Sequence, residues 1–428
     1  MRLIRQQVLP IGLDIGADSV KMLQVEPVGD HISVVASGRM AIPDESRADP
    51  AARMTVAADL VRQMLQTHPF IGNKIVACLP REIVHIKNVR LPLIPAAELS
   101  AAVEFEARNI FPFDVEQSRM HYVLAGEVRQ GTEVRQEVIA LAAQNSEVNQ
   151  FVEQLHRSGG AIESLDIEAI ALHRGYERYI RRRDDEQDVF VLVDVGLRRT
   201  QVIVCRGREL SFFKSIEIGG EHFNQAVSRK LGISVPEARA LRRRMCETAS
   251  PQDRGDSVTR AVFDATRTQM EDFSRELAMC LRYYLVTFRG HRPRVVRLVG
   301  GEANDPQLLV TTQSASSIPV EIAKPLLSAD TTRMRPADRR GSMSEWATAF
   351  GLALRMTKKN FGAIDGRPRD TVLPRSVAGV GSLVEVVDLN HAVQAAAKLP
   401  EIPARRSSDH GPAPVIAPHS DATEVARA

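Results

Sequence analysis

The chain has 428 residues, of which 44% are hydrophobic and 25% charged, and its formal net charge is only +3. These values are ordinary for a soluble globular protein of two or three domains, and they give no global electrostatic case for nucleic-acid binding. No apolar stretch reaches the roughly 20 residues that a membrane-spanning helix needs. The four cysteines lie far apart without a CxxC pair, so we expect reduced thiols and no metal cluster built on them.

The first predicted unit begins with IGLDIGADSVKMLQV, residues 11–25, and continues through HISVVASG. Its alternation of apolar runs and Gly-rich turns predicts three successive strands joined by tight turns. Asp14 lies inside the first apolar run, between Gly12 and Gly16. A carboxylate at that place in a strand requires an explanation.

A second unit, LVDVGLRRTQVIVCRGREL followed by LSFFKSIEI, repeats this pattern about 180 residues later. Asp194 aligns with Asp14, and Gly196 aligns with Gly16. Two similar units half a chain apart predict a duplicated fold with one copy in each of two lobes.

The repeated turns indicate a nucleotide site. A glycine lets the backbone approach a ligand closely, and consecutive N–H groups of such a turn form an anion-binding concavity. A carboxylate just before the turn can hold magnesium or its waters, since Mg²⁺ is usually bound by one or two carboxylates plus phosphate oxygens. We therefore expect the two copies to hold a nucleotide polyphosphate between the lobes, with Asp14 and Asp194 on the metal side. The alternative is that each Asp only caps its hairpin turn.

The stretch VVRLVGGEANDPQLL, residues 295–309, predicts a short strand, the pair Gly300-Gly301 and a helix start. Asn304 or Asp305 is the expected N-cap, with Pro306 in the first turn. The glycine pair would allow a base and ribose to lie against the backbone.

Between the two units lies a stretch that nucleotide chemistry does not require. Residues 95–111 carry apolar side chains at helical spacing, and we expect this helix to pack on a small sheet made of KIVACLP, EIVHIKNVRL and QEVIALAA. A second helix is expected over residues 145–158, ending at Gly159. This module could accept an extended peptide beside its sheet, or it could only brace the lobe.

The remaining segments carry no residues that we assign to the nucleotide site on their pattern alone. Residues 268–288 predict a helix whose stripe of Phe273, Leu277, Leu281 and Tyr284 belongs to the core. The basic runs at 181–183 and 242–244 are expected to be solvated faces rather than phosphate patches. Residues 361–428 lack aromatic side chains after Phe361 and are rich in proline, so we expect a flexible tail. Within it, residues 386–399 are a poor candidate for a membrane anchor.

In this order, GLDIGADSVK, LVDVGLRRTQ and LVGGEAND resemble the phosphate-1, phosphate-2 and adenosine segments of the actin-like ATPase superfamily. Within it, the sequence resembles the PilM family of type IV pilus assembly proteins, which is related to the division protein FtsA. Residues 79–117 resemble the subdomain that this family inserts in its first lobe, and residues 163–172, 216–242 and 344–355 resemble other family segments. The resemblance covers residues 10–358.

The resemblance implies a duplicated, actin-like (ribonuclease H-like) α/β fold with a nucleotide cleft. We expect a first lobe at 1–74, a partner-binding insert at 75–165, a return to the first lobe at 166–186, a second lobe at 187–360 and the tail. The implied cofactors are ATP and Mg, and Glu168 is the residue expected to orient an attacking water. The residues expected at the nucleotide are Asp14, Gly16, Ala17, Asp18, Ser19, Lys21, Asp194, Gly196, Arg199, Thr200, Gly219, Gly220, Gly300 and Gly301.

Three departures from the family pattern bear on chemistry. Ala17 stands where the family usually has Thr, which removes one hydroxyl contact, although Ser19 and Lys21 remain. Arg198 and Arg199 make the second turn unusually basic. Glu302 follows the adenosine glycines in place of another glycine. We expect nucleotide binding, with at most slow hydrolysis.

The implied function is an ATP-binding scaffold at the cytoplasmic face of the inner membrane. It would recruit the N-terminal cytoplasmic peptide of a PilN-like bitopic membrane protein and other pilus or secretion components, with self-association possible. One alternative is an FtsA-like filament, but the tail lacks that family's basic amphipathic anchor. The other is a kinase, but no sugar-type motif supplies the base and substrate pocket that a kinase needs.

Overall fold

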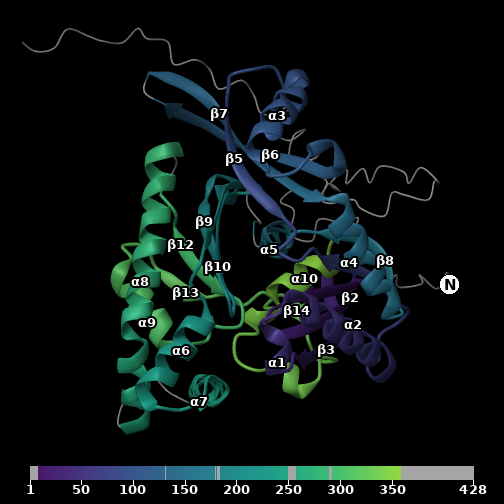
Figure 1. The fold of residues 1–428 in the computed structure, drawn as a ribbon, viewed down its shortest axis with the longest axis vertical. Coiled ribbons are helices and arrows are strands. Elements are labelled where there is room, and N and C mark those ends of the chain that lie inside the picture. Colours follow the sequence, from purple (N-terminus) through teal and green to yellow (C-terminus); the bar gives the residue numbers. More distant parts are fainter. Residues whose placement is uncertain are drawn as a thin grey trace, which may run out of the picture.

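The computed structural model describes residues 8–130, 132–178, 180, 184–248, 257–288 and 292–357. They form two α/β lobes side by side, with a smaller sheet and its helix above them in the view of Figure 1. Among the described helices, none is both long and apolar enough to cross a membrane.

The first lobe is built on a six-stranded sheet in the order β14-β3-β2-β1-β4-β8. Helices α2 and α4 bury their apolar sides against one face of this sheet. The strands are β1 (Ile11–Ile15), β2 (Ser19–Val28), β3 (His31–Ala41), β4 (Lys74–Cys78), β8 (Ala161–Asp166) and β14 (Ala329–Asp330), and the helices are α1 (Asp44–Arg47), α2 (Pro50–Thr67) and α4 (Asn145–Arg157).

The second lobe has a five-stranded sheet in the order β11-β10-β9-β12-β13. The long helix α8 packs on it through Phe273, Leu277, Leu281 and Tyr284, which confirms the predicted core stripe. The elements are β9 (Val189–Val195), β10 (Thr200–Arg206), β11 (Glu209–Ile216), β12 (Val295–Val299), β13 (Val320–Ile322), α6 (Gly220–Leu231), α7 (Val235–Thr248), α8 (Ser257–Phe288) and α9 (Pro306–Ala315). Asp305 caps α9 and Pro306 begins it, as predicted.

The insert consists of β5 (His85–Pro92), α3 (Ala96–Ile110), β6 (Ser118–Gln130) and β7 (Glu133–Gln144), with sheet order β5-β7-β6. Leu99, Val103 and Ala107 of α3 are buried against this sheet, as the helical spacing predicted. The prediction that KIVACLP belongs to the small sheet is wrong, because its strand β4 pairs with β1 and β8. A continuous apolar run is typical of a parallel strand buried on both faces, and β4 occupies such a place.

Helix α5 (Glu168–Glu177) contacts both lobes, and helix α10 (Ala347–Ala353) packs on α5 and on the first-lobe strands. Buried side chains of α5 share one core with residues of both large sheets. Helix α10, the last in the described chain, lies among the first-lobe strands in Figure 1. This packing is close: a Cβ on Gly351 would lie 1.8 Å from the carbonyl oxygen of Ala171, and one on Gly12 would lie 2.2 Å from that of Ala349.

The pairing of strands changes how the chain is divided. Because β4 and β8 belong to the first-lobe sheet, the independent insert spans about residues 85–144 rather than 75–165. Strand β14 pairs with β3, and α10 packs in the first lobe, so the chain returns there from about residue 329 instead of remaining in the second lobe to 360. The predicted tail and the basic run at 181–183 lie outside the described residues.

Candidate functional site

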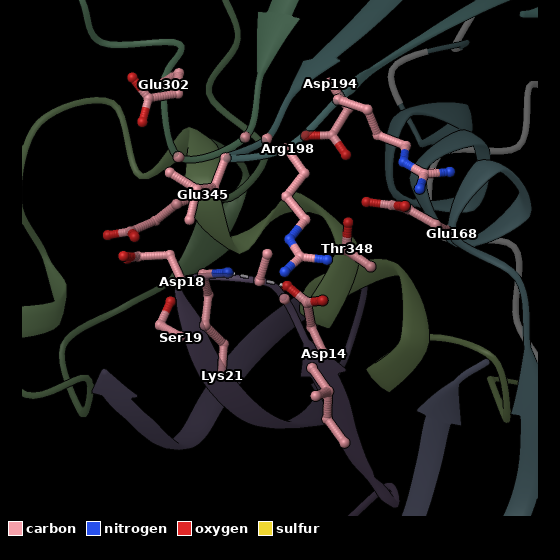
Figure 2. Close-up of a pocket in the computed structure, with 18 of the residues that line it drawn as sticks. Asp14, Asp18, Ser19, Lys21, Glu168, Asp194, Arg198, Glu302, Glu345 and Thr348 are labelled. Carbon is pink, nitrogen blue, oxygen red and sulfur yellow. Dashed lines mark hydrogen bonds and ion pairs between the residues drawn. The ribbon is translucent and has the colours of Figure 1, made fainter. Parts of the chain in front are cut away.

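A cleft of about 200 Å³ separates the lobes where the strands of both large sheets end. Asp14 lies near the carboxyl end of β1, and Asp194 near that of β9. Glu168 begins α5 directly after β8, and Arg81 lies in the loop that follows β4. The side chains of Asp14, Lys21, Glu168 and Asp194 face the same space in Figure 2. Ligand sites of open α/β sheets commonly lie outside the carboxyl ends of strands.

The two hairpin turns at this cleft have matching geometry. The Gly16 amide donates to the Ser19 carbonyl at 3.1 Å, and the Gly196 amide donates to the Arg199 carbonyl at 3.1 Å. In register, Asp14 stands opposite Lys21, and Asp194 stands opposite Gln201. The internal repeat in the sequence is therefore a repeat in structure.

Asp14 forms an ion pair with Lys21 on the neighbouring strand, with Nζ 3.0 Å from Oδ2. Burial raises the pKa of the Asp14 carboxyl, and the Lys21 ammonium opposes that rise. Burial lowers the pKa of Lys21, but the charges of Asp14 and Glu345 and the hydrogen bond to Asp14 together outweigh burial and leave this pKa above its ordinary value. Each group therefore depends on the other to remain charged in the cleft.

Arg81 holds the carboxylates on the opposite side of the cleft. Its Nε donates to Glu168, and its Nη2 donates to Asp194 Oδ2 at 2.9 Å. Gln201 also donates to Glu168, at 3.0 Å. Burial raises the pKa of Glu168, but the Arg81 guanidinium, the hydrogen bond with Asp194 and the charge of Lys21 together outweigh burial and hold this pKa at about 2. Burial and the adjacent Glu168 carboxylate raise the pKa of Asp194 well above its ordinary value.

The glycine pair after β12 has two different environments. Gly300 has a φ of +92°, and a Cβ there would lie 2.2 Å from Asp194 Oδ1, so this position requires glycine. No atom lies within 4 Å of the Cβ position of Gly301, which leaves its face open to the cleft.

The structure brings most of the predicted residues together. Those that line the cleft are Asp14, Gly16, Ala17, Asp18, Ser19, Lys21, Glu168, Asp194, Gly196, Arg199, Gly300 and Gly301. Thr200, Gly219 and Gly220 are not among its lining residues. Thr200 is buried and donates to the Ile218 carbonyl, and a Cβ on Gly220 would lie 2.2 Å from a Glu302 carboxylate oxygen. These three positions serve the packing of α6 against the second hairpin.

Several arginines in the cleft cross from one lobe to the other. Arg198 donates to the backbone carbonyl oxygens of Arg47 and Ala48, the latter at 2.7 Å. Arg243 pairs with Asp18 at 3.0 Å. Sequence reasoning did not find the role of Arg81, because its partner Asp194 is 113 positions away.

The prediction that residues 242–244 form a solvated face is wrong for Arg242. This side chain is buried and donates to both Glu302 and Asp305. The neighbouring Arg243 and Arg244 are exposed, but Arg243 also lines the cleft and pairs with Asp18. The pairing of Arg242 with Glu302 also gives a structural role to the acid that departs from the family pattern.

The arrangement does not fit a magnesium ion held by Asp14 and Asp194. Mg²⁺ takes oxygen ligands, usually several waters with one or two carboxylates, at about 2.0–2.1 Å in near-octahedral geometry. Here Asp14 Oδ2 receives the Lys21 ammonium, and Asp194 Oδ2 receives the Arg81 guanidinium. A divalent cation would have to enter against both of these positive groups.

Comparison with known proteins places this geometry in a family. A family model described as type IV pilus assembly protein PilM matches residues 12–357. No curated protein matches the sequence. A solved structure described as the PilM-PilN type IV pilus biogenesis complex has a TM-score of 0.67 and 21% identity, and the match covers 81% of this chain and 98% of that chain.

Two further solved structures have lower similarity. The ethanolamine utilization protein EutJ from Carboxydothermus hydrogenoformans has a TM-score of 0.47 and 13% identity, with 82% of this chain and 90% of that chain covered. MreB5 of Spiroplasma citri bound to AMPPNP has a TM-score of 0.45 and 10% identity, with coverage of 80% and 94%.

The predicted actin-like ATPase fold is confirmed, with its two lobes, its two matching hairpins and the cleft between them. The family match spans the first hairpin, the insert, the second hairpin and the closing helix α10. The chain therefore belongs to the PilM family of type IV pilus assembly proteins.

Proposed function

We propose that this protein is a scaffold of type IV pilus assembly. It binds ATP between its lobes and holds the N-terminal cytoplasmic peptide of a PilN-type inner-membrane protein. Through that partner it works at the cytoplasmic face of the inner membrane. The family match supports the pilus role, and the presence of PilN in the similar solved complex supports a PilN-type partner.

The observation that carries nucleotide binding is the pair of matching glycine turns facing one cleft. Such turns direct backbone N–H groups at an anion, and basic side chains nearby add charge. Arg199 and Lys21 supply this charge from the two lobes, and the open face of Gly301 offers a surface for a nucleoside.

Thermal melting with millimolar ATP tests this proposal. A ligand at about 100 times its dissociation constant adds about 2.7 kcal/mol to the free energy of unfolding, so the melting temperature should rise by several degrees. The variant Arg199→Ala should show a smaller rise, whereas Arg275→Ala, a solvent-exposed change on α8, should match the wild type. Absence of any rise in the wild type would refute nucleotide binding.

The cleft supports binding more than turnover. A general base works best when its pKa lies near the operating pH, and Glu168, with a pKa of about 2, is a poor proton acceptor. Glu168 remains our candidate for orienting a water. We expect ATP hydrolysis well below about 1 s⁻¹, the low end of typical enzymes. A faster steady rate would contradict a scaffold role.

The partner peptide is assigned to a groove of about 880 Å³ beside the insert. Ile86 of β5 lines one side, and Phe213 of β11 and Met279 of α8 line the other. Both β5 and β11 are outer strands of their sheets in the described chain. An extended peptide can add to such an edge through main-chain hydrogen bonds and place its side chains in the apolar pockets.

A pair of matched substitutions tests this groove. Met279 is 53% exposed, so Met279→Glu should leave folding intact and weaken peptide binding at least about tenfold by placing a charge in the groove. Leu327→Glu makes the same change at a residue that is 69% exposed and outside the groove, and it should bind the peptide like the wild type. Equal binding by all three proteins would exclude this groove as the peptide site.

A further inference from the structure

Arg81 lies between the two lobes and forms ion pairs with carboxylates of both. It comes from the first lobe and donates to Glu168 of the same lobe and to Asp194 of the second lobe. The guanidinium is planar and presents its donors in a fixed fork, so one side chain can serve two carboxylates at once. Its own exposure is 22%, and those of Glu168 and Asp194 are 14% and 7%, so this contact is largely shielded from water.

Asp14, a third carboxylate beside the glycine turns, is held in the same manner. Asp14 receives Lys21 from the neighbouring strand at 3.0 Å. Each of the three acids that could serve a cation at the phosphates is therefore already paired with one of two basic side chains of this chain. Glu168 accepts a second hydrogen bond from Gln201, which further fixes its orientation.

The cleft as a whole is also positive without a metal. Nine basic side chains line it against seven carboxylates, so a polyphosphate entering it meets a net positive site. Arginine binds phosphate oxygens through charge-assisted, often bidentate hydrogen bonds. The basic second turn, with Arg198 and Arg199, brings two of these groups to the cleft.

We propose that Arg81 takes the role of a divalent cation in this cleft, so that the protein binds a nucleoside polyphosphate without magnesium. The inference rests on the proposed nucleotide binding. The Arg81 guanidinium bridges the two lobes and offsets the carboxylates that would otherwise repel the phosphates. A magnesium ion would have to displace it from both carboxylates and then remain close to its positive charge, which Coulomb repulsion opposes.

Calorimetric titration of the full chain with ATP, in EDTA and in millimolar magnesium, tests the inference. The wild type should bind ATP in EDTA with a dissociation constant within about threefold of that in magnesium. Arg81→Ala should bind at least about tenfold more weakly in EDTA, because Glu168 and Asp194 then face the phosphates unneutralised. Magnesium should restore its affinity to within about threefold of the wild type, since both carboxylates are then open to the metal.

Two further variants keep the result interpretable. Arg81→Lys retains a positive charge but cannot span both carboxylates, so its binding in EDTA should lie between those of the wild type and Arg81→Ala. Arg81→Lys also replaces Arg81→Ala as the test variant if thermal melting shows that Arg81→Ala does not fold. Arg275→Ala is the control, because Arg275 is exposed on α8 outside the cleft.

The possible outcomes separate the two proposals. Wild-type binding that is at least about tenfold weaker in EDTA than in magnesium would overturn the role of Arg81 and leave nucleotide binding intact. Wild-type affinity retained by Arg81→Ala in both buffers would also overturn it. Absence of ATP binding by the wild type in either buffer would refute the proposed nucleotide site and, with it, this inference.

Discussion

The charged residues of the cleft neutralise one another in pairs that link strands and lobes. Glu168 depends on Arg81, and Asp14 depends on Lys21. Removing one member of a buried pair leaves the other without compensation, which is more costly than the net contribution of the pair itself. The protein should therefore become less stable when the acids of this region are protonated or replaced.

Glu168→Gln should lower the free energy of unfolding by about 3 kcal/mol at pH 7, because Arg81 loses one of its two carboxylates. The pKa of Glu168 is lowered in the folded state from its ordinary 4.5 to about 2. Its contribution is thus complete above pH 4.5 and is lost as the pH falls toward 2. Urea unfolding of wild type and variant across this range should show the difference shrinking with acid.

The control for this experiment is Glu104→Gln, an exposed residue of α3, which should change stability by less than about 0.5 kcal/mol at any pH. A difference between wild type and Glu168→Gln that stays constant as the pH falls would contradict the assigned ion pair.

The adjacent glycines Gly300 and Gly301 should respond oppositely to alanine. Gly300→Ala is expected to destabilise the protein, because its φ is positive and its Cβ would collide with Asp194. Gly301→Ala should leave the free energy of unfolding within about 0.5 kcal/mol, since its Cβ meets open space, but it should weaken ATP binding if a nucleoside lies there. Urea unfolding and calorimetry separate the two effects, and normal ATP affinity in Gly301→Ala would exclude that surface.

Individual residues differ in how well the sequence predicts them. Asp14, Asp194 and Gly300 stand in local patterns of strand, turn and glycine, and these patterns predicted their place at the cleft. Arg81 has no such pattern, because its partner comes from the other lobe. Arg242 was not predicted to be buried, because in sequence it is only one member of a basic run and its partners Glu302 and Asp305 are about 60 positions away.

At the scale of elements, helix α10 packs so closely against α5 that only glycine fits at position 351. Gly351→Ala should lower the free energy of unfolding by about 3 kcal/mol, because its Cβ would lie 1.8 Å from a backbone oxygen of α5. Helix α5 cannot shift without disturbing the core that it shares with both large sheets. Chemical denaturation measures this loss. Gly159→Ala, with open space around its Cβ but a positive φ, provides a milder comparison. If both substitutions lowered the free energy of unfolding equally, the close contact of α10 with α5 would not be the cause of the loss in Gly351→Ala.

Local periodicity predicted the six hairpin strands, α3, α4 and the buried stripe of α8, since each depends on neighbours in sequence. It did not predict β6, whose register shifts between Leu124 and Gly126, or the sheet to which β4 belongs. Strand partners are set by long-range pairing, and alternation alone does not reveal them.

For the whole molecule, the family match ends at residue 357, and the contacts that define the cleft and the groove all lie before that point. We therefore expect that deleting residues 358–428 changes the affinity for a PilN-type peptide by less than about threefold. Fluorescence anisotropy of the labelled peptide compares the full and shortened chains. Loss of binding on deletion would move the partner site into the C-terminal segment.

A scaffold must bind its partner, so direct binding of the partner peptide is the most direct test of the proposed function. The measurement is anisotropy of a labelled N-terminal cytoplasmic peptide from a PilN-type protein, titrated with the full chain. We predict a dissociation constant in the micromolar range, about −8 kcal/mol, that Met279→Glu weakens at least about tenfold and Leu327→Glu leaves unchanged. Absence of binding up to millimolar protein would contradict the scaffold role.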